Sequence, residues 1–178
     1  MDEQELRALI RSIPDFPREG ILFRDVTTLI GHGAGFAASV DWLSAQAHSI
    51  GAQAIVGIEA RGFIFGAPVA ARLGLPFIPV RKPGKLPVAT LSAEYALDYG
   101  FDSLELDPDA VATGQRAVVI DDLLATGGTA LAAIHLVRLA GGVVDSALFV
   151  IDLPDLGGSA ALERASITGR ALLSFEGH

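Results

Sequence analysis

The stretch Val118–Ala130 reads VVIDDLLATGGTA and decides the fold of this chain. An apolar, β-branched run stops at two adjacent carboxylates, and a turn of small residues leads into an apolar helical pattern. In such a strand–turn–helix unit the backbone amides of the turn converge on an anion, and the helix dipole favours negative charge. Glycines let the backbone approach closely, and threonine hydroxyls add donors. We therefore predict a phosphate-binding turn formed by Ala125, Thr126, Gly127, Gly128 and Thr129.

The two carboxylates beside this turn, Asp121 and Asp122, need a separate explanation because carboxylates repel phosphate. They are explained if they bind sugar hydroxyls, or an Mg²⁺ ion that itself holds the substrate. A ligand that carries both a phosphate and a vicinal diol is a ribose phosphate. The alternative is a polar strand end that caps the next helix.

Other nucleotide-binding motifs fit less well. No glycine-rich loop is followed by the Lys and Ser/Thr of a Walker A motif. The glycines of Gly31–Gly35 lack the third glycine of a dinucleotide-binding fingerprint and follow no convincing strand.

Length and composition predict one compact cytoplasmic domain spanning residues 1–178. A chain of 178 residues, 51% of them hydrophobic, is long and apolar enough to bury a sizeable core. No apolar run approaches the roughly 20 residues that span a bilayer, and the acidic N-terminus does not resemble a secretory signal. The absence of cysteine excludes disulfides and thiolate metal sites.

The charge pattern favours a small anionic ligand over a nucleic acid. The formal net charge is −8, whereas nucleic-acid surfaces depend on clustered Lys and Arg. Cations gather locally at Arg81, Lys82 and Lys85. The four histidines are scattered without metal-ligand spacing.

Alternating strand and helix patterns predict an α/β fold with a mostly parallel sheet. We expect helices over residues 2–13, 35–50, 63–73 (with Pro68 in its first turns), 128–140 and 158–164. We expect strands at 54–58, 77–80, 118–120 with the residues before it, 143–151 and 171–175, and a short extended piece at 21–23.

The segment Lys82–Asp102 lacks clear periodicity and is long for a loop in a compact domain. We interpret it as a lid that closes over the substrate, with strands expected around Thr90–Ser92 and Leu104–Leu106. The alternative is an exposed β-excursion without a chemical role.

The quoted stretch resembles the phosphoribosyl-pyrophosphate (PRPP) motif of the type I phosphoribosyltransferases. Four other stretches resemble the adenine-specific members of this family. They are Phe16–Ile30 (FPREGILFRDVTTLI), Gly57–Ala71 (GIEARGFIFGAPVAA), Pro79–Pro87 (PVRKPGKLP) and the C-terminal DLPDLGGSAALE. The likeness covers nearly the whole chain. It implies a central, mostly parallel sheet flanked by helices, a flexible lid and a small N-terminal hood.

This resemblance implies transfer of the 5-phosphoribosyl group from PRPP to adenine, which gives AMP and pyrophosphate in purine salvage. Asp121 and Asp122 would then bind the ribose, and Mg²⁺ would be held mainly through the substrate, with both aspartates as candidate ligands. Arg61 is implied as a catalytic residue. The implied pyrophosphate ligands are Arg61, Arg81, Lys82 and Lys85, some of them shared across a homodimer interface. A local ion pair between Arg61 and Glu59 is the structural alternative.

The resemblance assigns adenine recognition to the segment Leu22, Phe23 and Arg24, with Leu123 packed on the purine face. Phe23 could equally belong to the core. The family usually carries a glutamate in the lid sequence LEYG, whereas this chain reads LDYG at 97–100. We expect Asp98 to act as the general acid, supported by Tyr99.

Two other functions stay open at this stage. One is transfer to hypoxanthine, guanine or xanthine, and the other is a non-catalytic PRPP-sensing regulator. A regulator that bound nucleic acid should show a basic face or an added helix-turn-helix, and the sequence shows neither. No membrane partner is expected.

Overall fold

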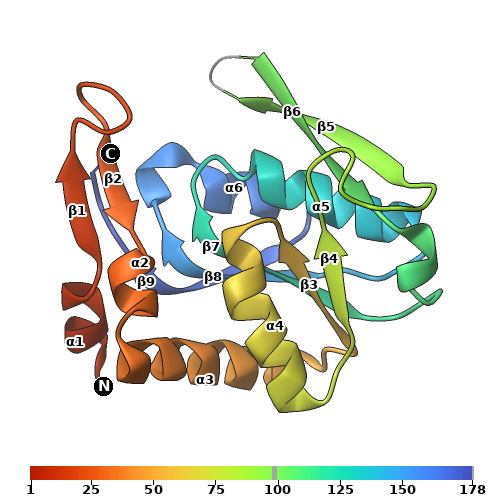
Figure 1. Ribbon diagram of the computed structural model, residues 1–178, viewed down its shortest axis with the longest axis horizontal. Coiled ribbons are helices and arrows are strands. Elements are labelled where there is room, and N and C mark those ends of the chain that lie inside the picture. The colour runs from red at the N-terminus through yellow and green to blue at the C-terminus, as the bar shows by residue number, and fades with distance from the viewer. Residues whose placement is uncertain (98–99, 178) are drawn as a thin grey trace.

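The computed structural model describes residues 1–97 and 100–177, and it has a parallel sheet with helices on both faces (Figure 1). Five strands form this sheet in the order β4-β3-β7-β8-β9, and every neighbouring pair is parallel. The prediction of an α/β fold with a central parallel sheet is confirmed. The strands are β3 (Ala54–Ile58), β4 (Phe77–Val80), β7 (Ala117–Leu124), β8 (Ser146–Asp152) and β9 (Thr168–Ser174).

Two hydrophobic clusters pack against opposite faces of the sheet, because successive strand residues point to opposite sides. Val118 and Ile120 pack on the side of α3 and α4, whereas Val119 packs on the side of α5 and α6. The helices are α1 (Glu3–Ala8), α2 (Thr27–Ile30), α3 (Gly33–Ile50), α4 (Arg61–Leu73), α5 (Gly128–Leu139) and α6 (Gly158–Arg164), with short 3-10 turns at Pro108–Ala110 and Pro154–Leu156.

The strand order reverses between β3 and β7. From β3 the chain proceeds through α4 to β4 on one side, and β7 returns to pair with β3 on the other side. Ligands of open α/β sheets bind at such a reversal, beside the carboxyl ends of the strands. The fold therefore places the segments after β3 and β7 at the expected ligand site.

The N-terminus forms a small hood rather than one long helix. The helix expected over residues 2–13 is wrong beyond Ala8, because α1 ends there and Arg11–Pro14 forms β1. This strand pairs antiparallel with β2 (Leu22–Asp25), so pairing outweighs the helical spacing of its apolar residues. The hood is a separate two-stranded sheet.

The expected lid segment is an antiparallel hairpin over much of its length. Strands β5 (Leu91–Leu97) and β6 (Gly100–Leu106) pair from Leu91 and Leu106 onward, so the strands expected at 90–92 and 104–106 are its base. Buried Leu104 and Leu106 pack into the core beside α5, which stabilises the hairpin. In Figure 1 the hairpin projects from the face that α5 covers.

Several element boundaries differ from the sequence prediction. Strand β7 does not stop at Ile120 but continues through both aspartates to Leu124, because β8 pairs with it up to that residue. Pro68 is wrongly expected in the first turns of its helix: α4 begins at Arg61, so Pro68 is its eighth residue. Strand β8 begins at Ser146 instead of 143, and β9 begins at Thr168 instead of 171. In the described part of the chain, no helix combines the length and the apolar character that crossing a membrane requires.

Candidate active site

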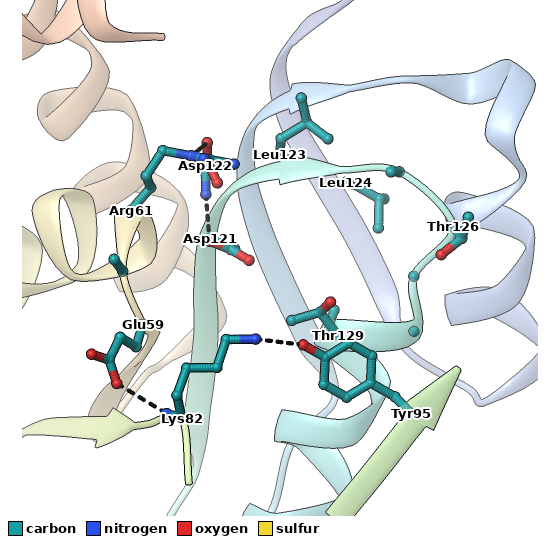
Figure 2. A pocket seen from close by; sticks show the side chains of 15 residues that line it. Glu59, Arg61, Lys82, Tyr95, Asp121, Asp122, Leu123, Leu124, Thr126 and Thr129 are labelled. Atoms are coloured by element: carbon teal, nitrogen blue, oxygen red, sulfur yellow. Dashed lines mark hydrogen bonds and ion pairs between the residues drawn. The ribbon is translucent and has the colours of Figure 1, made fainter. Parts of the chain in front are cut away.

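A cavity of about 380 Å³ lies at the carboxyl ends of β3 and β7 (Figure 2). It brings together the segment after β3, the end of β7 with the turn into α5, one side chain from the segment after β4 and one from the hairpin. All the predicted phosphate and ribose ligands line it. The lining residues are Glu59, Ala60, Arg61, Lys82, Tyr95 and residues 121–130.

The turn of residues 125–129, predicted to bind phosphate, leaves the start of α5 open to an anion. Gly127 precedes the helix with φ of 87°, a left-handed conformation that favours glycine. No side chain caps the first turn of α5, so its amides remain available, as phosphate binding requires.

Helix α6 begins with a residue that packs directly against this turn. A Cβ atom at Gly158 would lie 2.3 Å from the carbonyl oxygen of Ala125, and one at Gly127 would lie 3.2 Å from the carbonyl oxygen of Gly158. The two segments therefore touch through backbone atoms, and this contact requires glycine at position 158.

Asp121 and Asp122 have different surroundings although they are adjacent. Asp122 is only 4% exposed, and its Oδ2 accepts a hydrogen bond of 2.5 Å from Nε of Arg61. Asp121 accepts at Oδ1 from the amide of Asp122. Burial, and then the charge of Asp122, raise the pKa of Asp121 well above its ordinary value. Asp122 is thus the partner of Arg61, and Asp121 is the carboxyl group that a bound cation would help to ionise.

Close backbone packing makes the Arg61–Asp122 contact possible. A Cβ at Gly62 would lie 2.8 Å from the carbonyl oxygen of Ile120 and 3.0 Å from Oδ1 of Asp121. Only glycine lets the first turn of α4 lie directly against the end of β7.

Arg61 and Glu59 pair with other residues rather than with each other. Glu59 accepts from Nε and Nη2 of Arg81 at 3.2 Å and from the amide of Lys82 at 2.9 Å. Those hydrogen bonds lower the pKa of Glu59. Burial would lower the pKa of Arg61, but the charge and hydrogen bond of Asp122 outweigh it and raise the pKa. The alternative of a local Glu59–Arg61 ion pair is therefore not found. The peptide bond between Glu59 and Ala60 is cis.

The predicted pyrophosphate ligands fall into two groups. Arg61 and Lys82 line the cavity. Arg81 is instead held by Glu59 and donates to the carbonyl of Lys85, whose own side chain is exposed outside the lining.

The hairpin reaches the cavity through Tyr95, and its Asp102 contacts Lys82. Nζ of Lys82 donates to the hydroxyl of Tyr95 at 2.8 Å and to Oδ2 of Asp102 (Figure 2 shows the first of these contacts). Burial would lower the pKa of Lys82, but these hydrogen bonds raise it. A Cβ at Gly128 would lie 3.5 Å from the carbonyl oxygen of Ala96, so the hairpin passes close over the phosphate-binding turn. The predicted catalytic residues Asp98 and Tyr99 lie outside the described residues.

A second cavity of about 320 Å³ lies in the hood and shares Arg61 with the first. Of the predicted adenine ligands, Phe23 and Arg24 line this cavity, whereas Leu123 lines the first and Leu22 lines neither. The other lining residues are Ile13, Phe16, Asp25, Val26 and Thr27. Phe16 meets Phe23 edge to face with ring centroids 5.1 Å apart, and the lining is largely apolar, as a purine requires.

Sequence reasoning missed several lining residues. Glu59 and Tyr95 in the first cavity were not assigned ligand roles, nor were Phe16, Asp25 and Thr27 in the second. A charge within the apolar stretch ILFRDVTTLI was the signal that could have singled out Asp25.

A protein-only metal site is not formed by the described residues, which contain no group of three or more His, Cys, Asp or Glu side chains suited to a metal. The carboxylates that line the cavity are those of Asp121 and Asp122 at the end of β7 and that of Glu59, which is paired with Arg81. Any metal ion in the cavity would therefore need ligand atoms from the substrate and water.

A glycine-containing turn, two acids and an arginine meet at the reversal of a parallel sheet, which is the arrangement expected of a phosphoribosyltransferase. Consistently, residues 30–161 match the family model described as "Phosphoribosyl transferase domain". The chain is 61% identical, over the full length of both proteins, to the adenine phosphoribosyltransferase of Novosphingobium aromaticivorans.

Solved structures agree with this match. The adenine phosphoribosyltransferase of Thermoanaerobacter pseudethanolicus superposes with a TM-score of 0.93 at 48% identity, covering 98% of this chain and 100% of the other. The enzyme from Saccharomyces cerevisiae, solved with adenine and an imino-altritol bisphosphate, gives a TM-score of 0.90 at 35% identity, covering 96% and 98%. The chain belongs to the adenine phosphoribosyltransferase family.

Proposed function

We propose that the protein transfers the 5-phosphoribosyl group of PRPP to N9 of adenine, forming AMP and releasing pyrophosphate. The observation that supports this proposal most directly is that two cavities meet at one residue, Arg61. One cavity is polar and contains the predicted phosphate-binding turn, and the other is largely apolar. A reaction that joins a sugar phosphate to a planar base needs two such sites side by side. The naming of the relatives and the adenine bound to the yeast enzyme support adenine as the base.

In this proposal the amides of residues 125–129 bind the 5′-phosphate of PRPP, and Asp121 and Asp122 bind its ribose hydroxyls. The C–N bond to N9 forms as the bond from ribose C1 to the pyrophosphate oxygen breaks, and the purine releases the proton carried on N7. Positive charge grows on the ribose ring during this step, and the two carboxylates lie where they can stabilise it.

Negative charge grows on the leaving pyrophosphate, and cations must offset it. Arg61 and Lys82 line the cavity and are proposed to bind this group directly. Arg81 and Lys85 lie outside the lining of the same chain, which fits the proposal that they act across a homodimer interface.

Mg²⁺ is the proposed cofactor. When bound with PRPP it would neutralise pyrophosphate oxygens and orient the ribose. The donor set fits, because Mg²⁺ prefers oxygen ligands and retains waters, and Asp121 offers a carboxyl group that a nearby cation would help to ionise.

The base is proposed to lie in the hood cavity against Phe23, with Leu123 reaching it from the neighbouring cavity. Asp98, supported by Tyr99, is proposed to act at N7 of the purine. It is the general acid that protonates N7 when AMP is split in the reverse reaction, and its carboxylate accepts the N7 proton when AMP forms. The acidic net charge and the proposed soluble substrates fit a cytoplasmic enzyme without nucleic-acid or membrane partners.

The test is product formation from PRPP and Mg²⁺ with adenine, hypoxanthine, guanine and xanthine in parallel. We expect kcat/KM for adenine to exceed the values for the other bases at least about 100-fold, because a hydrogen-bonding site rejects a base with reversed donors and acceptors. Turnover of a 6-oxopurine instead would keep the PRPP site and overturn the adenine assignment. Saturable PRPP binding without turnover would indicate that the protein is a non-catalytic PRPP-sensing regulator.

A further inference from the structure

The hood that carries the base cavity is not part of the central sheet. Its strands β1 and β2 pair only with each other among the described strands, so no β-ladder fixes the hood on the core. Other contacts must therefore hold it at the position where its cavity meets Arg61. The end of β9 and the residues after it supply such contacts, since the C-terminus lies beside β2 (Figure 1).

The ring of Phe175 packs against two arginines, Arg7 of α1 and Arg24 of β2. Its ring centroid is 4.7 Å from the guanidinium carbon of Arg7 and 4.8 Å from that of Arg24. The ring is only 8% exposed and belongs to the same hydrophobic cluster as Leu6 and Val26.

The backbone carbonyls of the residues before and after Phe175 accept hydrogen bonds from the same two arginines. Arg7 donates from Nη1 to the carbonyl of Ser174 at 2.6 Å, and Arg24 donates from Nη2 to the carbonyl of Glu176 at 2.9 Å. Arg24 also donates from Nη1 to the hydroxyl of Ser12 on β1, at 2.6 Å. The side chain of Arg24 thus connects both hood strands to the segment after β9.

The two guanidinium groups carry like charges beside one ring, so their arrangement needs contacts that offset the repulsion. Burial, and then the charge of Arg7, lower the pKa of Arg24. The faces of the ring attract cations and the carbonyls accept from them, and both effects offset the repulsion. Removing the ring would remove an attraction that both arginines share and leave the repulsion between them.

We propose that Phe175 and the carbonyls of Ser174 and Glu176 form a clamp. The clamp positions Arg24 and thereby keeps the hood cavity next to Arg61. Phe175 is a positioning residue, since it lines neither cavity. The consequence for catalysis rests on the proposed function, because it assumes that the base occupies the hood cavity.

The test compares Phe175→Ala with Phe175→Tyr, which keeps the ring, and with Val144→Ala. Val144 is 1% exposed in the other hydrophobic cluster and lines neither cavity, so its truncation controls for general loss of packing. Two readouts are measured on the full chain: amide hydrogen exchange, and the separate KM values for adenine and PRPP.

For Phe175→Ala we expect KM for adenine to rise about ten-fold, as the loss of two cation–ring contacts predicts. KM for PRPP should change less than about two-fold, because the ring removed here does not touch the PRPP cavity. Amides of β1 and β2 should exchange faster while those of β3 and β7 keep their rates. Phe175→Tyr and Val144→Ala should leave the ratio of the two KM values unchanged.

Unchanged hood exchange, or an equal rise of both KM values in Phe175→Ala, would overturn the clamp. If the unsubstituted protein forms no AMP, the proposed function fails, and the exchange of the hood amides alone decides whether the clamp exists.

Discussion

Arg61 bonds Asp122 through Nε and Oδ2, and the same arginine lines both cavities. The two residues come from the segments after β3 and at the end of β7, which are neighbours because the strand order reverses there. The ion pair therefore marks the boundary between the proposed PRPP and base sites, and it holds the arginine where the ribose would meet the base.

Replacing Asp122 by Asn removes the charge that holds Arg61 while keeping the shape of the side chain. We expect kcat/KM for PRPP to fall about 100-fold, since the carboxylate is lost both as a partner of Arg61 and beside the ribose. Steady-state kinetics provide the measurement. The matched control is Asp41→Asn, which breaks the exposed ion pair with Arg72 and should leave kinetics unchanged. Equal activity of the two variants would contradict this role of Asp122.

A methyl group at Gly62 should displace the first turn of α4 from the end of β7. Because the new Cβ would meet Ile120 and Asp121 within 3.0 Å, we expect Gly62→Ala to lower the free energy of unfolding by about 1–3 kcal/mol. Gly33→Ala is the control, since nothing lies within 4 Å of a Cβ there. Denaturant titrations that give both variants the same stability would refute the close-packing argument.

Gly158→Ala should weaken PRPP binding by displacing the turn of residues 125–129. The added Cβ would lie 2.3 Å from the Ala125 carbonyl, so the turn must move. We predict a rise in KM for PRPP of about ten-fold with a smaller effect on KM for adenine. Ser159→Ala, one residue further along α6, should change neither value. A normal KM for PRPP in Gly158→Ala would mean that α6 does not position the turn.

Low pH should destabilise the hood because Asp25 becomes protonated. Hydrogen bonds from Thr27, and then from Arg11, lower the pKa of Asp25 from 3.8 to about 2. A lowered pKa stabilises the fold above the unfolded value, and this stabilisation is lost as the pH falls from about 4 through 2. We therefore expect Asp25→Asn to cost about 2 kcal/mol at pH 7 and roughly half of that at pH 3. Unfolding free energies measured at both pH values check this, and a difference that stays constant with pH would exclude Asp25 as the source.

Local patterns in the sequence predicted the parts of the site that depend on consecutive residues. The turn from Ala125 to Thr129 and the two aspartates all line one cavity, and strands β3 and β4 have the predicted bounds. These features follow from short-range chemistry, namely glycine conformations, β-branched runs and a helix start.

Features that depend on tertiary contacts were not predictable in this way. The helical spacing of Leu6, Leu9, Ile10 and Ile13 does not reveal that β1 pairs with β2. The partner of Arg61 comes from β7 and that of Glu59 is the residue after β4. Both are distant in sequence, and the local alternative therefore misassigned them. The base cavity likewise depends on how the hood lies against Arg61, which no single stretch encodes.

The decisive measurement is the stoichiometry of the products formed from PRPP, Mg²⁺ and labelled adenine. The two-cavity account predicts AMP and pyrophosphate in equal amounts, with no AMP when PRPP is omitted. Hydrolysis of PRPP to ribose 5-phosphate while adenine stays unchanged would contradict it.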